Sequence, residues 1–238
     1  MYPHHLKTLT RADHDHEAFA AVMRGLHALE TLAGRFHSAL YLFDHSAALR
    51  ELSRQVARGR FETEQELRDQ RLTNRWPMLA AREGAFVLYD FSYALSNTKT
   101  AIREYPALNA LVDWSYLKRA RAIFKMGFPH WKKLRNAVGH TGEFAITKAQ
   151  WNANSLKGSA NVIGSSVGPG NHVTILNGRT YHDTTFGGDF LSYELSDESL
   201  ARLWTIIAAV YESMDAASSK PMDERIATRV KLLRKFKG

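Results

Sequence analysis

The stretch AFVLYDFSYAL (residues 85–95) is apolar on nearly every side of a helical wheel and contains one charged residue, Asp90. A helix with this pattern is typical of the buried centre of a protein. We expect the helix to have Pro77 in its first turn, where proline is well tolerated, and to continue to about Arg103. Pro106 prevents its continuation.

Further segments with apolar residues at helical spacing lie on both sides of this central helix. We expect helices at residues 17–43, 46–58, roughly 112–126, 130–142, and after a cap at Ser196 or Asp197. The last of these helices carries an apolar stripe formed by Leu200, Leu203, Trp204, Ile207, Val210, Tyr211 and Met214. Residues 62–71 are charged throughout, which fits either a solvated helix or a linker.

Residues 160–196 have a different pattern, because they are rich in Gly, Ser, Thr and Asn and contain alternating segments. The dipeptide Asn177-Gly178 joins two such segments, residues 172–176 and 179–183, and predicts a β-hairpin. Residues 190–195 predict a third strand. The glycine-rich run GSSVGPG (164–170) lacks the GK[ST] ending of a phosphate-binding loop, so we expect a mobile connector there.

These segments together predict a mainly α fold, an antiparallel helical bundle with a small three-stranded β insertion before the last long helix. We expect one domain over residues 1–238, with the insertion at about 160–196 and a basic tail at about 220–238. The chain has no cysteine, which excludes disulfides, thiolate zinc sites and cysteine nucleophiles. It also lacks an apolar run of membrane-spanning length and a signal-peptide pattern, so we expect a cytoplasmic protein without a membrane partner.

The chain is strongly basic, with 32 Lys and Arg against 24 Asp and Glu and a formal net charge of +8. An excess of this kind attracts polyanions such as nucleic acids. Charge alone leaves a basic but indifferent surface equally open.

The segment WKKLRNAVGH (131–140) combines a buried stripe with polar residues that carry chemistry. On a helical wheel Leu134 and Val138 share one face and define the stripe that packs on the core. Asn136 and His140 are four residues apart on the opposite face, so their side chains are neighbours. This placement argues against a core role for the histidine. A plain solvent-facing polar helix remains the alternative.

Arg135 lies at the margin between the two faces, and its side chain is long enough to reach either of them. The segment from Leu134 to His140 resembles the Arg–polar–xxx–His motif of the HEPN superfamily (higher eukaryote and prokaryote nucleotide-binding domain). The setting is also similar, since the motif falls on a late helix of a bundle and an amphipathic helix follows. The resemblance covers roughly residues 76–214, with the β segment as an insertion.

The resemblance implies a homodimer that brings two motif helices together in a basic cleft. Active members of the superfamily are metal-independent RNA endonucleases. It implies that His140 is the general acid–base for attack of the RNA 2′-hydroxyl on the adjacent phosphorus. Arg135 would stabilise the charge that develops on the phosphoryl oxygens, and Asn136 would orient the imidazole or the phosphate. No cofactor is expected. An antitoxin or another protein is a further candidate partner, as in toxin–antitoxin and defence systems.

Several other residues are supporting candidates. Asp90 has apolar helical neighbours and should be partly buried, and Arg135 is a candidate for the cation that compensates it. The alternatives are a narrower buried stripe, or a partner for Asp90 elsewhere in the chain. Basic side chains that could contact RNA phosphates are Lys132, Lys133, Arg229, Arg234 and Lys235. The tail that carries the last three could equally be a solvated end. The HDHE run (14–17) has metal-ligand residue types but no helical spacing that suits a site, so no metal site is expected.

Three functions follow from these candidates. The first is a ribonuclease of the toxin or defence type. The second is a non-catalytic module that binds a nucleotide, RNA or a protein. The third is an interaction protein in which the face of the motif helix is only a dimer contact.

Overall fold

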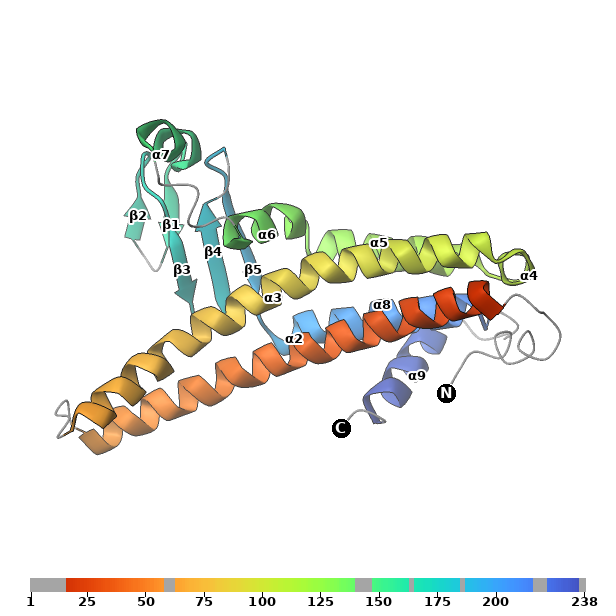
Figure 1. Cartoon of the computed structure of the whole chain (residues 1–238), viewed down its shortest axis with the longest axis horizontal. Helices are drawn as coiled ribbons and strands as arrows, with labels where there is room; N and C mark the ends of the chain where they lie inside the picture. Colours follow the sequence, from red (N-terminus) through yellow and green to blue (C-terminus); the bar gives the residue numbers. More distant parts are fainter. Residues whose placement is uncertain are drawn as a thin grey trace. The chain divides into compact units, whose positions relative to one another are not determined.

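The structure is a computed structural model that describes residues 16–57, 63–139, 147–162, 165–184, 187–215 and 222–235 (Figure 1). The fold is mainly α, with a small antiparallel sheet before the long helix α8, as predicted. The described helices are α2 (His16–Ala57), α3 (Glu64–Glu104), α4 (Pro106–Asn109), α5 (Trp114–Gly127), α6 (Trp131–Gly139), α7 (Lys148–Asn154), α8 (Asp197–Ser213) and α9 (Met222–Lys235). The described strands are β1 (Ala160–Val162), β2 (Ser165–Val167), β3 (Thr174–Asn177), β4 (Thr180–Thr184) and β5 (Phe190–Glu194).

The central helix forms as expected, but its start was predicted wrongly. Helix α3 begins at Glu64, so that Pro77 lies inside it. Proline has no N–H to donate to the carbonyl of Thr73, which weakens the helix at this point. The residues before Pro77 are nevertheless helical, and ion pairs such as the one from Arg68 to Glu64 (2.6 Å) support their first turns. The charged segment is therefore the first part of α3.

Helix α2 is continuous where two separate helices were expected. Ser46, at the predicted break, is buried, and its hydroxyl donates to the carbonyl of Phe43 at 2.7 Å. This bond satisfies the hydroxyl within the helix, so the polar residue does not end it.

The described chain divides into two compact units that are interleaved in sequence. Unit 1 contains residues up to 34, residues 90–129 and residues from 198 onward. Unit 2 contains residues 35–89 and 130–197. Helices α2 and α3 contribute residues to both units, and each unit is described by itself below.

Unit 1 is a helical bundle. Its parts of α2 and α3 run antiparallel side by side (Figure 1), and they approach closely at Gly25, where an added Cβ would lie 2.5 Å from Thr98 Oγ1. Helix α5 begins after Asp113, whose carboxylate accepts a hydrogen bond from the backbone N–H of Ser115 at 2.9 Å. The rings of Phe91 and Phe124 stack with centroids 5.8 Å apart and join α3 to α5.

The predicted apolar stripe of α8 lies in the core of unit 1. All of its residues except Leu200 are buried. Tyr211 adds a polar contact, because its hydroxyl donates to Glu30 of α2 at 2.8 Å. The stripe and this hydrogen bond together hold α8 against α2.

Helix α9 is joined to α8 by a buried ion-pair network in unit 1. Arg229 is 8% exposed, and its guanidinium donates to Glu212 at 2.7 Å and to Asp215 at 2.8 Å. The guanidinium also lies 5.9 Å from the centroid of the Tyr211 ring. The assignment of Arg229 as a phosphate contact is therefore wrong, because its donors already bind two carboxylates inside the unit.

Unit 2 contains the three-stranded sheet, an antiparallel meander in the order β3-β4-β5. The predicted hairpin is present, although its turn is displaced by one residue. Asn177 pairs with Thr180, so the two turn residues are Gly178 and Arg179. Gly178 has φ +56°, a conformation that glycine adopts without strain.

A second small sheet lies in the segment that was expected to be a mobile connector. Residues 165–167 form β2, which pairs antiparallel with β1. The prediction of a connector is wrong for these residues, because the pairing partner that gives Ser-Ser-Val its strand conformation lies outside the glycine-rich run. The short helix α7 was not predicted. It begins with a capping box between Thr147 and Gln150.

The sheet of unit 2 is attached to helices α2 and α3. The hydroxyl of Tyr193 on β5 donates to the carbonyl of Ala81 in α3. Gly84 leaves the space for this contact, since an added Cβ would overlap the Tyr193 hydroxyl. Arg179 in the hairpin turn donates to Asp44 of α2 at 2.6 Å. In the same unit Arg35 of α2 and Glu83 of α3 form an ion pair at 2.7 Å.

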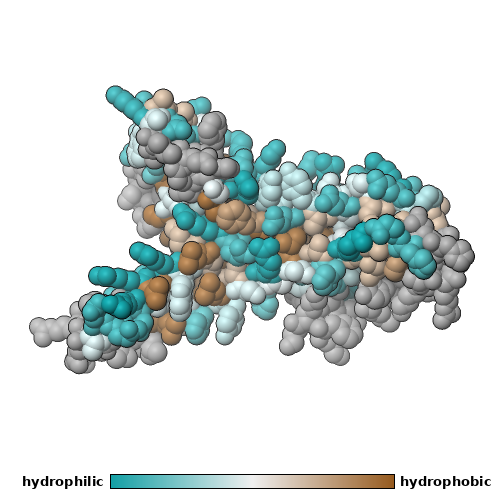
Figure 2. Space-filling view, viewed as in Figure 1, coloured by the Kyte–Doolittle hydropathy of each residue, from teal (hydrophilic) through white to brown (hydrophobic). Residues whose placement is uncertain are grey.

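The surface is mixed in character, with hydrophobic residues among hydrophilic ones (Figure 2). Tyr41, Leu72 and Leu79 are among the exposed large hydrophobic residues. Scattered exposure of this kind is normal for a folded protein. Among the residues that the structure describes, no helix combines the length and apolarity needed to cross a membrane.

We expect Gly188→Ala to destabilise unit 2 strongly. Gly188 has φ +75°, and an added Cβ would overlap the backbone carbonyl oxygen of Ser155. Gly170→Ala is the matched control, because φ there is +84° but no atom lies within 4 Å of an added Cβ. Backbone strain should lower the free energy of unfolding of the control by about 1–2 kcal/mol, and Gly188→Ala should lower it further. Urea denaturation measures both, and equal losses would contradict the predicted overlap.

We expect Arg229→Ala to lower the free energy of unfolding by about 3–5 kcal/mol, since it leaves the buried Glu212 carboxylate uncompensated. Arg119→Ala is the control, because the ion pair of Arg119 with Asp223 also reaches α9 but is exposed. The free energy of unfolding of the control should fall by about 1 kcal/mol or less. Similar losses in the two variants would show that Arg229 does not act as a buried partner.

Candidate functional site on helix α6

Helix α6 packs one face on the sheet of unit 2, against β4 and β5, and presents the other face outward. Leu134, Ala137 and Val138 are buried, as the wheel predicted for the stripe through Leu134 and Val138. Lys132 and Lys133 are exposed, whereas Arg135 and Asn136 are partly buried. The helix therefore separates its apolar face from the basic and amide groups of the candidate site.

Arg135 lies over an aromatic ring in unit 2. Its guanidinium carbon is 5.1 Å from the centroid of the Tyr89 ring. The Tyr89 ring is in turn tilted against Trp131, with centroids 5.5 Å apart. A cation in this position is attracted by the face of the ring. The aromatic ring thus restrains the guanidinium at the margin of α6, where the sequence placed it.

The guanidinium also lies beside the end of α6. An added Cβ on Gly139 would be 3.6 Å from Arg135 Nη1 and 3.7 Å from Phe86 Cε1. Gly139 is the last residue of the helix and is joined by one peptide bond to His140. His140 lies outside the described residues, as does Gly142, the predicted end of this helix. Within the described residues, the cation of the motif lies next to the residue that precedes the histidine.

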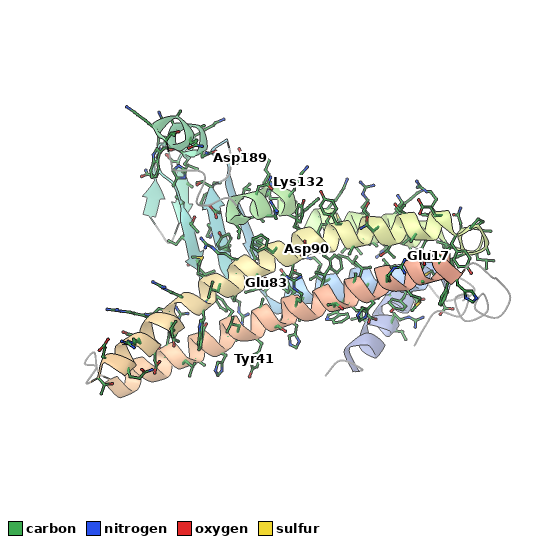
Figure 3. All side chains as sticks on the ribbon, in the orientation of Figure 1. Glu17, Tyr41, Glu83, Asp90, Lys132 and Asp189 are labelled. Atoms are coloured by element: carbon green, nitrogen blue, oxygen red, sulfur yellow. The ribbon has the colours of Figure 1, made fainter. Side chains whose placement is uncertain are left out.

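Asp189 lies near helix α6 in unit 2 (Figure 3), and basic residues surround its carboxylate. Lys133 Nζ donates to the carboxylate of Asp189 on the segment before β5. This hydrogen bond, together with the positive charges of Lys133, Lys157 and His130, holds the pKa of Asp189 below its usual value. Lys133 was predicted as a site residue, whereas Asp189 and Lys157 were not, because no local sequence pattern shows that residues 133 and 189 are in contact.

The other predicted site residues are placed less favourably or are not described. Asp90 is exposed, so the prediction of partial burial is wrong (Figure 3). The outward turn of this residue was missed because apolar neighbours at helical spacing do not fix the width of the buried face. The pair between Asp90 and Arg135 stays a prediction. The side chains of Arg234 and Lys235 lie outside the described residues.

Metal ligation has no support in the described part of the chain, where no three His, Cys, Asp or Glu side chains come together. Residues 14 and 15 of the HDHE run lie outside the described residues. Glu17 forms an exposed ion pair with Arg24 at 2.5 Å.

A second group of titratable residues lies between the sheet and α3 in unit 2. The buried Asp183 accepts hydrogen bonds from Tyr181 (2.5 Å) and Thr174 (3.2 Å). Burial is the main cause of a raised pKa for both Asp183 and Tyr181, and the positive charge of Arg82 partly opposes it. These groups were missed as a set, because Asp183 was treated only as part of a strand. Asp183 accepts both of these hydrogen bonds from residues of its own sheet, which fits a structural role.

Comparisons with known proteins do not add to this picture. No protein-family model matches the chain, no curated protein matches it, and no solved structure matches it.

The raised pKa of Asp183 predicts a pH-dependent stability. A carboxyl whose pKa is higher in the folded state binds a proton more readily there than in the unfolded chain, where the value is near 3.8. Its contribution is fully present at acidic pH and is lost as pH rises from about 4 through the folded pKa. Urea denaturation from pH 4 to pH 8 should show a decline in wild type that is absent in Asp183→Asn. Parallel curves for the two proteins would contradict this assignment.

Proposed function

We propose that this chain is a metal-independent RNA endonuclease with a HEPN-like site formed by Arg135, Asn136 and His140. The observation that carries the proposal is the position of the Arg135 guanidinium, restrained over Tyr89 and beside Gly139. A fixed cation next to the residue that precedes His140 is the arrangement that stabilisation of a phosphoryl group requires.

The proposed reaction needs one nucleophile, one proton acceptor and one proton donor. The RNA 2′-oxygen attacks the adjacent phosphorus as His140 accepts its proton. The bond from phosphorus to the 5′-oxygen breaks, and a proton is returned to that oxygen. The products are a 2′,3′-cyclic phosphate and a 5′-hydroxyl. Arg135 stabilises the charge on the non-bridging oxygens, and Asn136, four residues before His140, orients the imidazole or the phosphate.

The alternative is a HEPN-like module that binds RNA, a nucleotide or a protein without cleaving anything. The exposed Lys132 and Lys133 favour it, because cations on the first turn of α6 can bind phosphate whether or not the histidine acts.

We further propose that the chain forms a homodimer in the cytoplasm and that a protein partner such as an antitoxin controls it. Light scattering of the purified protein tests the dimer.

We expect purified protein to cut RNA in the presence of EDTA and to leave 2′,3′-cyclic phosphate ends. His140→Ala should reduce the cleavage rate by about 10²-fold or more, the lower range for loss of a general acid–base. His37→Ala is the control, since His37 is an exposed histidine on α2. Cleavage that requires a metal, or that survives in His140→Ala, would overturn the proposal. Binding without turnover would favour the alternative.

A further inference from the structure

Backbone hydrogen bonds of the two residues before Asp189 hold it in the basic cluster of unit 2. The backbone N–H of Gly187 donates to Asn154 at 3.3 Å, and that of Lys157 donates to the carbonyl of Gly188 at 3.4 Å. Gly188 lies so close to the carbonyl of Ser155 that no larger residue fits. The backbone before β5 is therefore fixed on the end of α7, and it directs the Asp189 carboxylate to Lys133.

The cluster has more positive than negative charge. Lys133 donates directly to the Asp189 carboxylate, and Lys157 lies against the preceding residue, with its Cγ 3.0 Å from an added Cβ on Gly188. The charges of Lys133, Lys157 and His130 lower the pKa of Asp189. Asp189 is the only acidic residue in this set of four described residues, and Lys132 adds an exposed cation next to it in sequence. The Lys133–Asp189 pair is open to solvent, with side chains 57% and 47% exposed.

The cluster is continuous with the motif along α6. Lys133 and Asn136 are three residues apart on the same side of the helix, about 4.5 Å along its axis. An anionic strand bound at Lys133 would therefore pass Asn136 and the end of the helix beside Arg135. A single small anion would use the cluster alone, whereas an RNA strand would use both positions.

We propose that the cluster of His130, Lys133 and Lys157 is a binding site for an RNA backbone phosphate, and that the Asp189 carboxylate occupies the position of that phosphate until RNA displaces it. The inference deepens the proposed function, on which it rests for RNA as the anion. RNA is the occupant that the charge of the cluster and its continuity with the motif favour. Asp189 then acts as a built-in competitor that lowers the affinity for RNA.

The test compares two variants that remove one negative charge each. Asp189→Asn removes the competitor. Asp44→Asn is the matched control, because Asp44 also lies in unit 2, is 45% exposed and pairs with a cation, Arg179. Binding is measured on the full chain by fluorescence anisotropy with a labelled, single-stranded 2′-O-methyl RNA, which cannot undergo attack by the 2′-oxygen.

We expect Asp189→Asn to tighten binding of this RNA by about three- to fivefold, the effect of losing a competing surface ion pair. Asp44→Asn should change the affinity by less than about twofold. Lys133→Ala and Lys157→Ala should each weaken binding and reduce the slope of log affinity against log salt by about one.

Three outcomes would overturn the inference. The first is no change in Asp189→Asn, and the second is equal tightening in Asp189→Asn and Asp44→Asn, which would show an effect of net charge alone. The third is equal tightening for RNA and for inorganic polyphosphate, which would make the cluster an unselective anion site. Because this RNA is not cleaved, the result is independent of the His140 experiment. If the protein cleaves RNA but Asp189→Asn does not change RNA affinity, only this inference is contradicted. If Asp189→Asn tightens RNA binding but the protein does not cleave RNA, only the nuclease proposal is contradicted.

Discussion

The close approach of Tyr193 to helix α3 is the constraint on which unit 2 depends. A sheet of three short strands is stable only if it buries an apolar face, and packing against a helix provides that burial. Gly84 has no side chain, so the Tyr193 ring can lie directly on the helix and its hydroxyl can reach the carbonyl of Ala81. Even an alanine at position 84 would overlap that hydroxyl and would lie 3.1 Å from Leu195. One missing side chain thus allows the sheet to be anchored.

The position of the motif helix follows from this anchor. Helix α6 is only nine residues long, which is too short to be stable in isolation. It forms because Leu134 and Val138 are buried against the sheet that Tyr193 attaches to α3. The ring of Tyr89, on the same stretch of α3, then restrains Arg135 from the other side. The candidate site is therefore a consequence of how the sheet sits within unit 2.

Most of the fold could be predicted from local sequence patterns. The predictions are wrong or incomplete where residues that are distant in the sequence determine the local structure. Helical spacing predicted the buried faces of α2 and α8, and Asn177-Gly178 predicted the hairpin. Pro77 was predicted to begin a helix, because proline prefers the first turn. That preference does not show whether the residues before the proline are also helical. In the site, the wheel predicted the buried face of α6 and the margin position of Arg135. It could not predict Asp189, because a contact across 56 residues leaves no local signal.

The basic side chains of the chain lie in two different settings, buried and exposed, and the cost of replacing their partners differs between the two. Arg229 was grouped with RNA contacts because the tail is basic, yet its guanidinium binds two carboxylates inside unit 1. Breaking such a buried pair costs about 3–5 kcal/mol, so no ligand can compete for it cheaply. The exposed pair of Lys133 and Asp189 is worth only about 0–1 kcal/mol. A phosphate that gains even one charge-assisted hydrogen bond, worth about 1.5–3 kcal/mol, can therefore replace the Asp189 carboxylate at little cost. With 32 cations and 24 acids, complete one-to-one pairing would still leave eight positive charges for a polyanion.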